Sequence, residues 1–200
     1  MTHVQKTAHR YKVVLIITAL LALLQTGIFA FVARSVSLEG DALHSIIDCF
    51  IIYGSMRVVL FARSMTKEER KKKEEWWDFI AILSLIVSAA LIGWEGWNRI
   101  HISHSATFNT TAVIGVSLLS LLGNLICYNV LKHIHKDHCD TKREVNIIHI
   151  AADFGMSLIV LVSTACVIFF KTAAFDGYGA LVLALGLALL SLHIASGHKH

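Results

Sequence analysis

The sequence VVLIITALLALLQTGIFAFVA, residues 13–33, contains 21 residues and no charged side chain. A helix rises about 1.5 Å per residue, so about 20 apolar residues cross the roughly 30 Å hydrocarbon core of a bilayer. The run is longer than the apolar part of a secretory signal peptide, which is usually about 7–15 residues. We therefore predict that residues 13–33 form a transmembrane helix.

Five further apolar runs follow this one. They predict membrane spans at about residues 42–61, 76–97, 108–131, 145–170 and 177–193. Of the 200 residues, 56% are hydrophobic, 16% are charged and none is proline, whereas a soluble domain averages about 25% charged residues. These features predict an all-α membrane protein: six transmembrane helices in a single domain over residues 1–200, with no soluble C-terminal domain.

The basic residues indicate which way the helices cross the membrane. Six spans place both termini on the same side. With the termini inside, 14 of the 18 Lys and Arg residues lie in cytoplasmic segments, three lie outside, and Arg57 lies within a span. The positive-inside rule therefore predicts cytoplasmic termini. The net charge of +4 follows from this asymmetry, and no nucleic-acid partner is expected.

Two of the spans repeat a His-x-x-x-Asp motif. EGDALHSIIDCFIIYG, residues 39–54, carries His44 and Asp48, and NIIHIAADFGMSLIVLV, residues 146–162, carries His149 and Asp153. Residues four apart share one helix face, and an ionisable residue within a bilayer is by default a functional hypothesis. The second and fifth helices run in opposite directions. If they are neighbours, His44 lies level with Asp153, and Asp48 lies level with His149.

The four side chains offer two imidazole nitrogens and two carboxylates. Tetrahedral Zn²⁺ binds both kinds of ligand, and Co²⁺, Cd²⁺ or other divalent metals are also compatible with them. We therefore predict one metal site formed by His44, Asp48, His149 and Asp153. In the alternative interpretation, each His bonds the Asp of its own helix in a purely structural pair. The repetition on two antiparallel helices favours the shared site.

Three segments resemble one transporter family. SLEGDALHSIIDCF, residues 37–50, is similar to the second transmembrane helix of the cation diffusion facilitator family, and residues 147–162 are similar to its fifth. FDGYGALVLALGLALL, residues 175–190, resembles the start of its sixth helix. The resemblance covers about residues 10–195 and implies that His44, Asp48, His149 and Asp153 form the transport site.

The resemblance also implies a function and an assembly. It implies export of a divalent metal from the cytoplasm, most simply Zn²⁺. Exchange for protons is expected as well, because carboxylates and imidazoles bind metal only when they are deprotonated. Family members work as homodimers, and we expect this chain to do so in the cell (inner) membrane. We expect the chain to depart from the family in lacking the usual cytoplasmic C-terminal domain, which normally secures the dimer.

Some polar residues lie outside the four-residue motif. The loop KHIHKDHCDTKREVN contains weaker candidates for metal binding, namely His133, His135, His138 and Cys139. Family members often have a His-rich stretch here, although an ordinary polar loop is an equal alternative. Asp41 is compatible either with capping the start of the second helix or with attracting cations at the outer mouth.

Two other functions use similar residues. An intramembrane zinc-dependent hydrolase keeps an open metal position for water and needs a nearby general base. Here four ligands fill the site, and no spare carboxylate adjoins either pair. A haem protein with His44 and His149 as axial ligands leaves two buried Asp residues unexplained. The sequence therefore favours a transporter and not an enzyme.

Overall fold

The computed structural model describes residues 3–61, 64–102, 109–133 and 140–197. This part of the chain forms six long α-helices and one short π-helix. In chain order they are α1 His3–Ile28, η1 Phe29–Ala33, α2 Val36–Phe61, α3 Lys67–Ile102, α4 Thr110–Lys132, α5 Asp140–Phe170 and α6 Ala174–Gly197. All six α-helices include a stretch long and apolar enough to cross a membrane, which confirms the predicted all-α fold.

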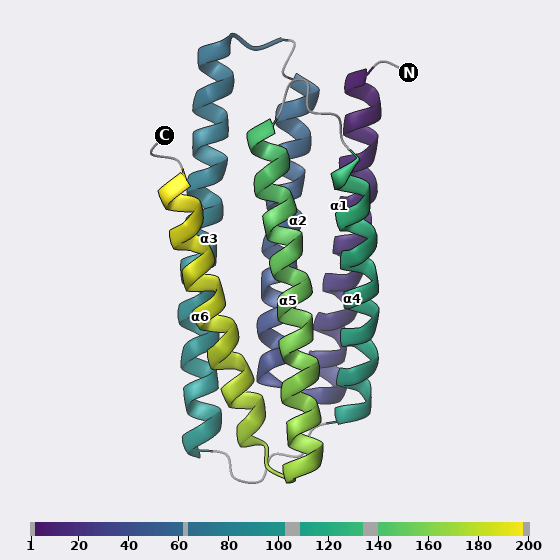
Figure 1. The fold of residues 1–200 in the computed structure, drawn as a ribbon, viewed down its shortest axis with the longest axis vertical. Coiled ribbons are helices and arrows are strands. Elements are labelled where there is room, and N and C mark those ends of the chain that lie inside the picture. The colour runs from purple at the N-terminus through teal and green to yellow at the C-terminus, as the bar shows by residue number, and fades with distance from the viewer. Residues whose placement is uncertain (1–2, 62–63, 103–108, 134–139, 198–200) are drawn as a thin grey trace.

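The helices alternate in direction along the long axis of the bundle (Figure 1). Helices α3 and α6 lie side by side on one flank, and α1 and α4 lie on the other, with α2 and α5 between them. Helices α2 and α5 run in opposite directions and contact each other. Both termini lie at one end of the bundle, and we refer to the opposite end as the distal end.

Several helices extend beyond the spans expected from hydropathy. Helix α2 begins at Val36 and not near residue 42, and α3 runs well past both ends of 76–97. The start of α3 is stabilised by a capping box, in which Thr66 and Glu69 hydrogen-bond each other's main-chain N–H groups. Hydropathy marks only the apolar part of such helices, because their polar turns can continue into water.

Two turns at the distal end, those after η1 and after α5, are short. Arg34 ends the first helical segment with a φ of 50°, and Lys171 follows α5 with a φ of 55°. Left-handed residues of this kind commonly close a helix and reverse the chain. Only two residues connect η1 to α2, so the distal ends of α1 and α2 stay close together.

The interior contains two apolar clusters. The α3/α6 cluster joins these two helices to the beginning of α2 and the later part of α5, and includes Leu38, Leu85, Met156, Val160, Leu183 and Leu187. The α1/α4 cluster joins those two helices to the later part of α2 and the beginning of α5, and includes Tyr11, Val14, Ile52, Leu131 and Ile150. On α2 the stretch between the two clusters holds His44 and Asp48, and on α5 Asp153 lies between Ile150 and Met156, with His149 next to Ile150.

The outer surface of the bundle is apolar. Leu20, Phe31 and Trp94 are 62%, 89% and 66% exposed, and similar side chains occur on the other helices. Such a continuous apolar surface is unfavourable in water but matches lipid tails. The protein is therefore an integral membrane protein.

A candidate metal site between α2 and α5

Helices α2 and α5 bring the two sequence motifs together. His44 and Asp48 are one turn apart on α2, and their side chains are 0% and 1% exposed. His149 and Asp153 are one turn apart on α5 and are 2% and 1% exposed. The i, i+4 spacing points each pair towards the other helix. All four ionisable side chains are therefore buried in the interior of the bundle.

The pairs expected across the two helices are present. His44 Nε2 lies 3.3 Å from Asp153 Oδ1, and His149 Nδ1 lies 3.2 Å from Asp48 Oδ1. Within α2, His44 Nε2 lies 3.5 Å from Asp48 Oδ2. Asp48 thus faces both imidazoles, one with each of its oxygens. The two rings are stacked at 18° with their centroids 6.1 Å apart.

Each of these three distances is close in length to the edge of a small metal tetrahedron, and Asp48 uses a different oxygen in each of its two contacts. Ligand atoms about 2.0–2.2 Å from a tetrahedral Zn²⁺ lie about 3.3–3.6 Å from one another. The three contacts measure 3.2, 3.3 and 3.5 Å. One ligand atom from each of His44, Asp48 and His149 can be chosen so that all lie within 4.8 Å of one another. Asp153 lies next to this group of three residues, because its Oδ1 contacts His44 Nε2.

Hydrogen bonds leave much of this cluster unsatisfied. Both ring nitrogens of His44 and of His149, both oxygens of Asp48, and Oδ1 of Asp153 have no well-aligned hydrogen bond to the described residues. Buried polar atoms normally have such partners, because leaving them unsatisfied costs about 1–3 kcal/mol each. The nitrogen and oxygen atoms of this cluster are therefore available to coordinate a metal ion.

Apolar packing isolates the four residues on either side along the bundle. On α2 they lie between Leu38 of the α3/α6 cluster and Ile52 of the α1/α4 cluster. On α5 they lie between Ile147, which packs against the α1/α4 cluster, and Met156 of the α3/α6 cluster. Low-polarity surroundings strengthen the attraction between a cation and its ligands.

The model of the cation efflux transmembrane domain matches residues 12–197 of this chain. The chain belongs to the cation efflux family. A comparison with curated proteins gives no match.

Membership of the cation efflux family decides between the function classes that the sequence left open. Members of this family transport divalent metal cations across membranes and are not enzymes. The matched segment includes most of α1, all of α2–α6 and both His-x-x-x-Asp motifs. The resemblance seen in the sequence is confirmed, and the hydrolase alternative is excluded.

The weaker candidates in the His-rich loop have different outcomes. His135, His138 and Cys139 lie outside the described residues. His133 is exposed at the end of α4, and its Nδ1 lies 2.7 Å from the Asn129 carbonyl oxygen. A carbonyl only accepts, so Nδ1 carries the hydrogen and Nε2 remains available as a ligand.

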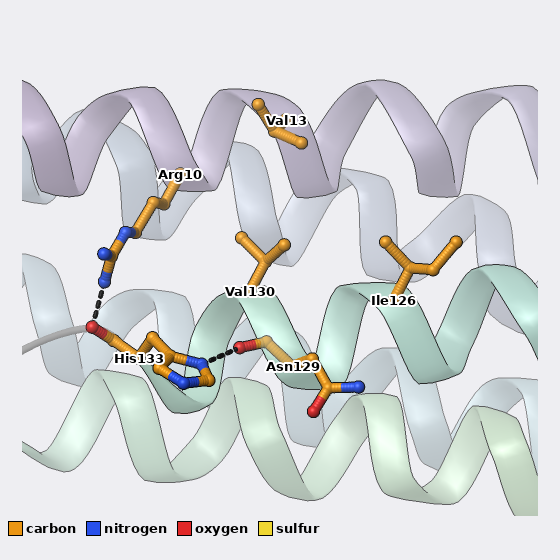
Figure 2. A pocket seen from close by; sticks show the side chains of 6 residues that line it. All are labelled: Arg10, Val13, Ile126, Asn129, Val130 and His133. Carbon is orange, nitrogen blue, oxygen red and sulfur yellow. Dashed lines mark hydrogen bonds between the residues drawn. The ribbon is translucent and has the colours of Figure 1, made fainter.

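His133 also borders a groove between α1 and α4, near the end that carries the termini (Figure 2). The groove has a volume of about 500 Å³ and is lined by Arg10, Val13, Ile126, Asn129, Val130 and His133. The Arg10 guanidinium donates a hydrogen bond to the His133 main-chain carbonyl. This contact ties the end of α4 to α1.

Two other buried carboxylates have roles that the sequence did not reveal. Asp41 lies in the sixth position of α2, so the expectation that it caps this helix is wrong. The cap comes from Asp176 at the start of α6, which accepts from the Val36 and Ser37 main-chain N–H groups at 2.8 and 3.2 Å. Asp176 is 140 residues away in sequence, so no local pattern could predict this contact.

Proposed function

We propose that the protein exchanges Zn²⁺ for protons across the membrane through a site formed by His44, Asp48, His149 and Asp153. The observation that carries the proposal is the buried cluster with ligand-atom contacts of 3.2–3.5 Å, which match the edges of a tetrahedral zinc site. Membership of the cation efflux family supports metal transport as the overall function.

The ligand types support Zn²⁺ over harder ions. Imidazole nitrogen suits Zn²⁺ and other borderline transition metals, whereas Mg²⁺ and Ca²⁺ prefer ligand sets made only of oxygen. Asp153 completes the set as the fourth ligand. Two carboxylates repel each other, and a divalent cation between Asp48 and Asp153 removes that repulsion. Co²⁺ and Cd²⁺ fit the same ligands.

Proton exchange follows from the chemistry of the same side chains. Metal binding requires neutral imidazoles and ionised carboxylates, so it displaces any protons they hold, and protonation in turn releases the metal. Alternating exposure of the site to the two sides then couples the movement of metal in one direction to that of protons in the other. The basic residues at the end that carries the termini support a cytoplasmic location for that end by the positive-inside rule, and exchange with entering protons then runs as export of the metal. The cell (inner) membrane is the location that we propose.

A flux experiment tests this function. The full chain is reconstituted into lipid vesicles that contain a fluorescent Zn²⁺ indicator, and a pH gradient is imposed across the membrane. We expect Zn²⁺ movement that stops when an ionophore dissipates the gradient. Asp48→Asn is the matched control, because it keeps the shape of the side chain but removes its charge, and it should abolish the flux. Zn²⁺ movement that does not depend on the gradient would indicate a channel or a uniporter.

We also propose that the protein is a homodimer held by its membrane helices. The outward face of α3 is the proposed contact, because Trp94 and Trp97 are 66% and 55% exposed there. The Trp97 ring stacks on His101 at 4.1 Å, which gives this face a fixed shape. Native mass spectrometry from nanodiscs should show two copies, and Trp94→Ala should favour the monomer. A wild-type protein that is only monomeric would contradict the proposal.

A further inference from the structure

A second buried polar cluster adjoins the four-residue site, so the expectation that no spare carboxylate adjoins either pair is wrong. Its centre is Asp41, whose side chain is 0% exposed and lies one turn before His44 on α2. Gln25 of α1 donates from Nε2 to Asp41 Oδ2 at 2.5 Å. The Ser157 hydroxyl of α5 donates to the same oxygen at 3.2 Å. Three helices therefore meet at this carboxylate.

This cluster keeps two oxygens without partners. Asp41 Oδ1 and Gln25 Oε1 are both buried and have no hydrogen bond to any described residue. They belong to the two groups that the Nε2–Oδ2 hydrogen bond joins, so they lie in the same small volume. The Ser157 hydroxyl donates to Asp41 and still has lone pairs with which to accept. Carboxylate, amide and hydroxyl oxygens are thus available together.

The cluster continues the polar face of the main site. Asp41, His44 and Asp48 have i, i+3, i+7 spacing on α2, and Asp153 and Ser157 have i, i+4 spacing on α5, so each set lies on one helix face. Asp41 precedes His44 by three residues, which is about 4.5 Å along the axis towards the distal end. An ion that leaves the four-residue site in that direction meets Asp41 next.

We propose that Asp41, Gln25 and Ser157 form a second, oxygen-only site that the transported divalent cation occupies between the four-residue site and the distal end. The proposal rests on the function proposed above. The second site carries one negative charge and has no imidazole, so it holds Zn²⁺ or Cd²⁺ more weakly than two His and two Asp do. Weak binding at this position favours onward release of the ion.

Asp176 provides a matched comparison for Asp41. Both are fully buried Asp residues close to the start of their helices, α2 and α6. Both oxygens of Asp176 accept hydrogen bonds, whereas Asp41 accepts the hydrogen bonds of Gln25 and Ser157 on a single oxygen. A purely structural role of Asp41 predicts that Asp41→Asn and Asp176→Asn behave alike. A cation site predicts that only Asp41→Asn changes metal binding.

Cadmium-113 NMR of the full chain in nanodiscs tests the second site. Cd²⁺ bound through nitrogen resonates at a higher chemical shift than Cd²⁺ bound only through oxygen. We expect one resonance with mixed ligands at low Cd²⁺ and an additional oxygen-only resonance at higher Cd²⁺. Asp41→Asn should remove the second resonance and keep the first, and Asp176→Asn should keep both. Absence of the second resonance from wild type, or its persistence in Asp41→Asn, would overturn the proposal.

Two further variants keep the test decisive. Gln25→Glu adds a second carboxylate, so it should bind Cd²⁺ at the second site about tenfold more tightly, and Cd²⁺ should raise its melting temperature more than that of wild type. If Asp41 has a purely structural role, Gln25→Glu should not increase Cd²⁺ affinity or the stabilisation by Cd²⁺. An unchanged Cd²⁺ affinity in Gln25→Glu would overturn the proposal even if Asp41→Asn fails to fold. Asp153→Ala reports separately on the main site, because it should remove the mixed-ligand resonance whatever the outcome for Asp41.

Discussion

Asp48 and Asp176 are buried to the same extent but have opposite surroundings. Asp176 accepts from the Ser35 and Ser37 hydroxyls at 2.6 and 2.5 Å, in addition to two main-chain N–H groups. Asp48 faces two imidazoles and has no well-aligned hydrogen bond to the described residues. Fixed donors make a carboxylate part of the architecture. Imidazole partners can lose a proton, so they leave the carboxylate available to a cation.

The largest expected effect is the loss of metal binding when Asp48 is removed. Asp48 contacts both imidazoles, so Asp48→Ala removes one ligand and the group that orients two others. We expect Zn²⁺ affinity to fall by on the order of 100-fold or more, equivalent to about 3 kcal/mol. Asp153→Ala should have a comparable effect, although Asp153 lies 105 residues away in sequence. Isothermal titration with Zn²⁺ measures both losses.

A double-mutant cycle shows whether the two motifs act as one site. Residues that act as a unit are strongly non-additive, so Asp48→Ala combined with Asp153→Ala should add little to either single loss. Two independent structural pairs would instead give additive effects, mainly on thermal stability. Single variants that bind Zn²⁺ like wild type would refute the shared site.

Removal of Asp176 should affect stability and leave the metal site intact. Asp176→Ala deprives two buried serine hydroxyls and the start of α2 of their acceptor, which costs about 2–4 kcal/mol of unfolding free energy. Zn²⁺ affinity of the folded fraction should stay within about twofold of wild type, because separate sites act independently. Thermal unfolding in detergent and Zn²⁺ titration measure the two quantities. If Asp176→Ala lost much of its Zn²⁺ affinity but none of its unfolding free energy, Asp176 would act like Asp48 and the comparison would fail.

Replacement of a ligand by one of another type should change selectivity more than affinity. His44→Asp keeps a ligand at the position but replaces nitrogen with oxygen, so preference should move towards the harder Mn²⁺ by about tenfold relative to Zn²⁺. Transport assays with each metal in competition measure the change. Asp176→Asn is the control and should not alter selectivity. An unchanged profile in His44→Asp would show that this side chain does not set the choice of metal.

The smallest effect is expected at an exposed carboxylate with a structural role like that of Asp176. The Thr66 main-chain N–H and hydroxyl donate to Glu69 at 2.9 and 3.1 Å, and they lower the pKa of the Glu69 carboxyl below its ordinary value. The stabilisation is therefore present at neutral pH and is lost as pH falls through that lowered pKa. The protection factors of the amides at the first turn of α3, corrected for intrinsic exchange at each pH, should fall at acidic pH, and Glu69→Gln should weaken this response. Identical pH responses in the variant and the wild type would contradict the prediction.

The order of these effects follows from burial and from the partners of each carboxylate. Glu69 can exchange its donors for water, so its removal leaves no buried group unpaired. Asp176 cannot, because it is 0% exposed. Asp48 is equally buried, but its partners are the other proposed metal ligands. Burial sets the size of an effect, and the chemistry of the partners decides whether stability or metal binding changes.

Much of this protein could be predicted from its sequence. Apolar runs of about 20 residues identify six membrane helices, because the bilayer thickness fixes how many residues a span requires. The two His-x-x-x-Asp motifs indicate the candidate site, because i, i+4 spacing fixes a common helix face and buried charge is costly. Both inferences depend only on local geometry and transfer energy.

The tertiary structure decided the roles of the remaining polar residues. Asp176 caps α2 across 140 residues, and Gln25 of α1 and Ser157 of α5 meet at Asp41 of α2. Hydropathy could not distinguish the architectural carboxylate from those near the candidate metal site, because all lie within or beside apolar runs. Their roles depend on which donors neighbouring helices bring to each oxygen, and helix packing alone determines that.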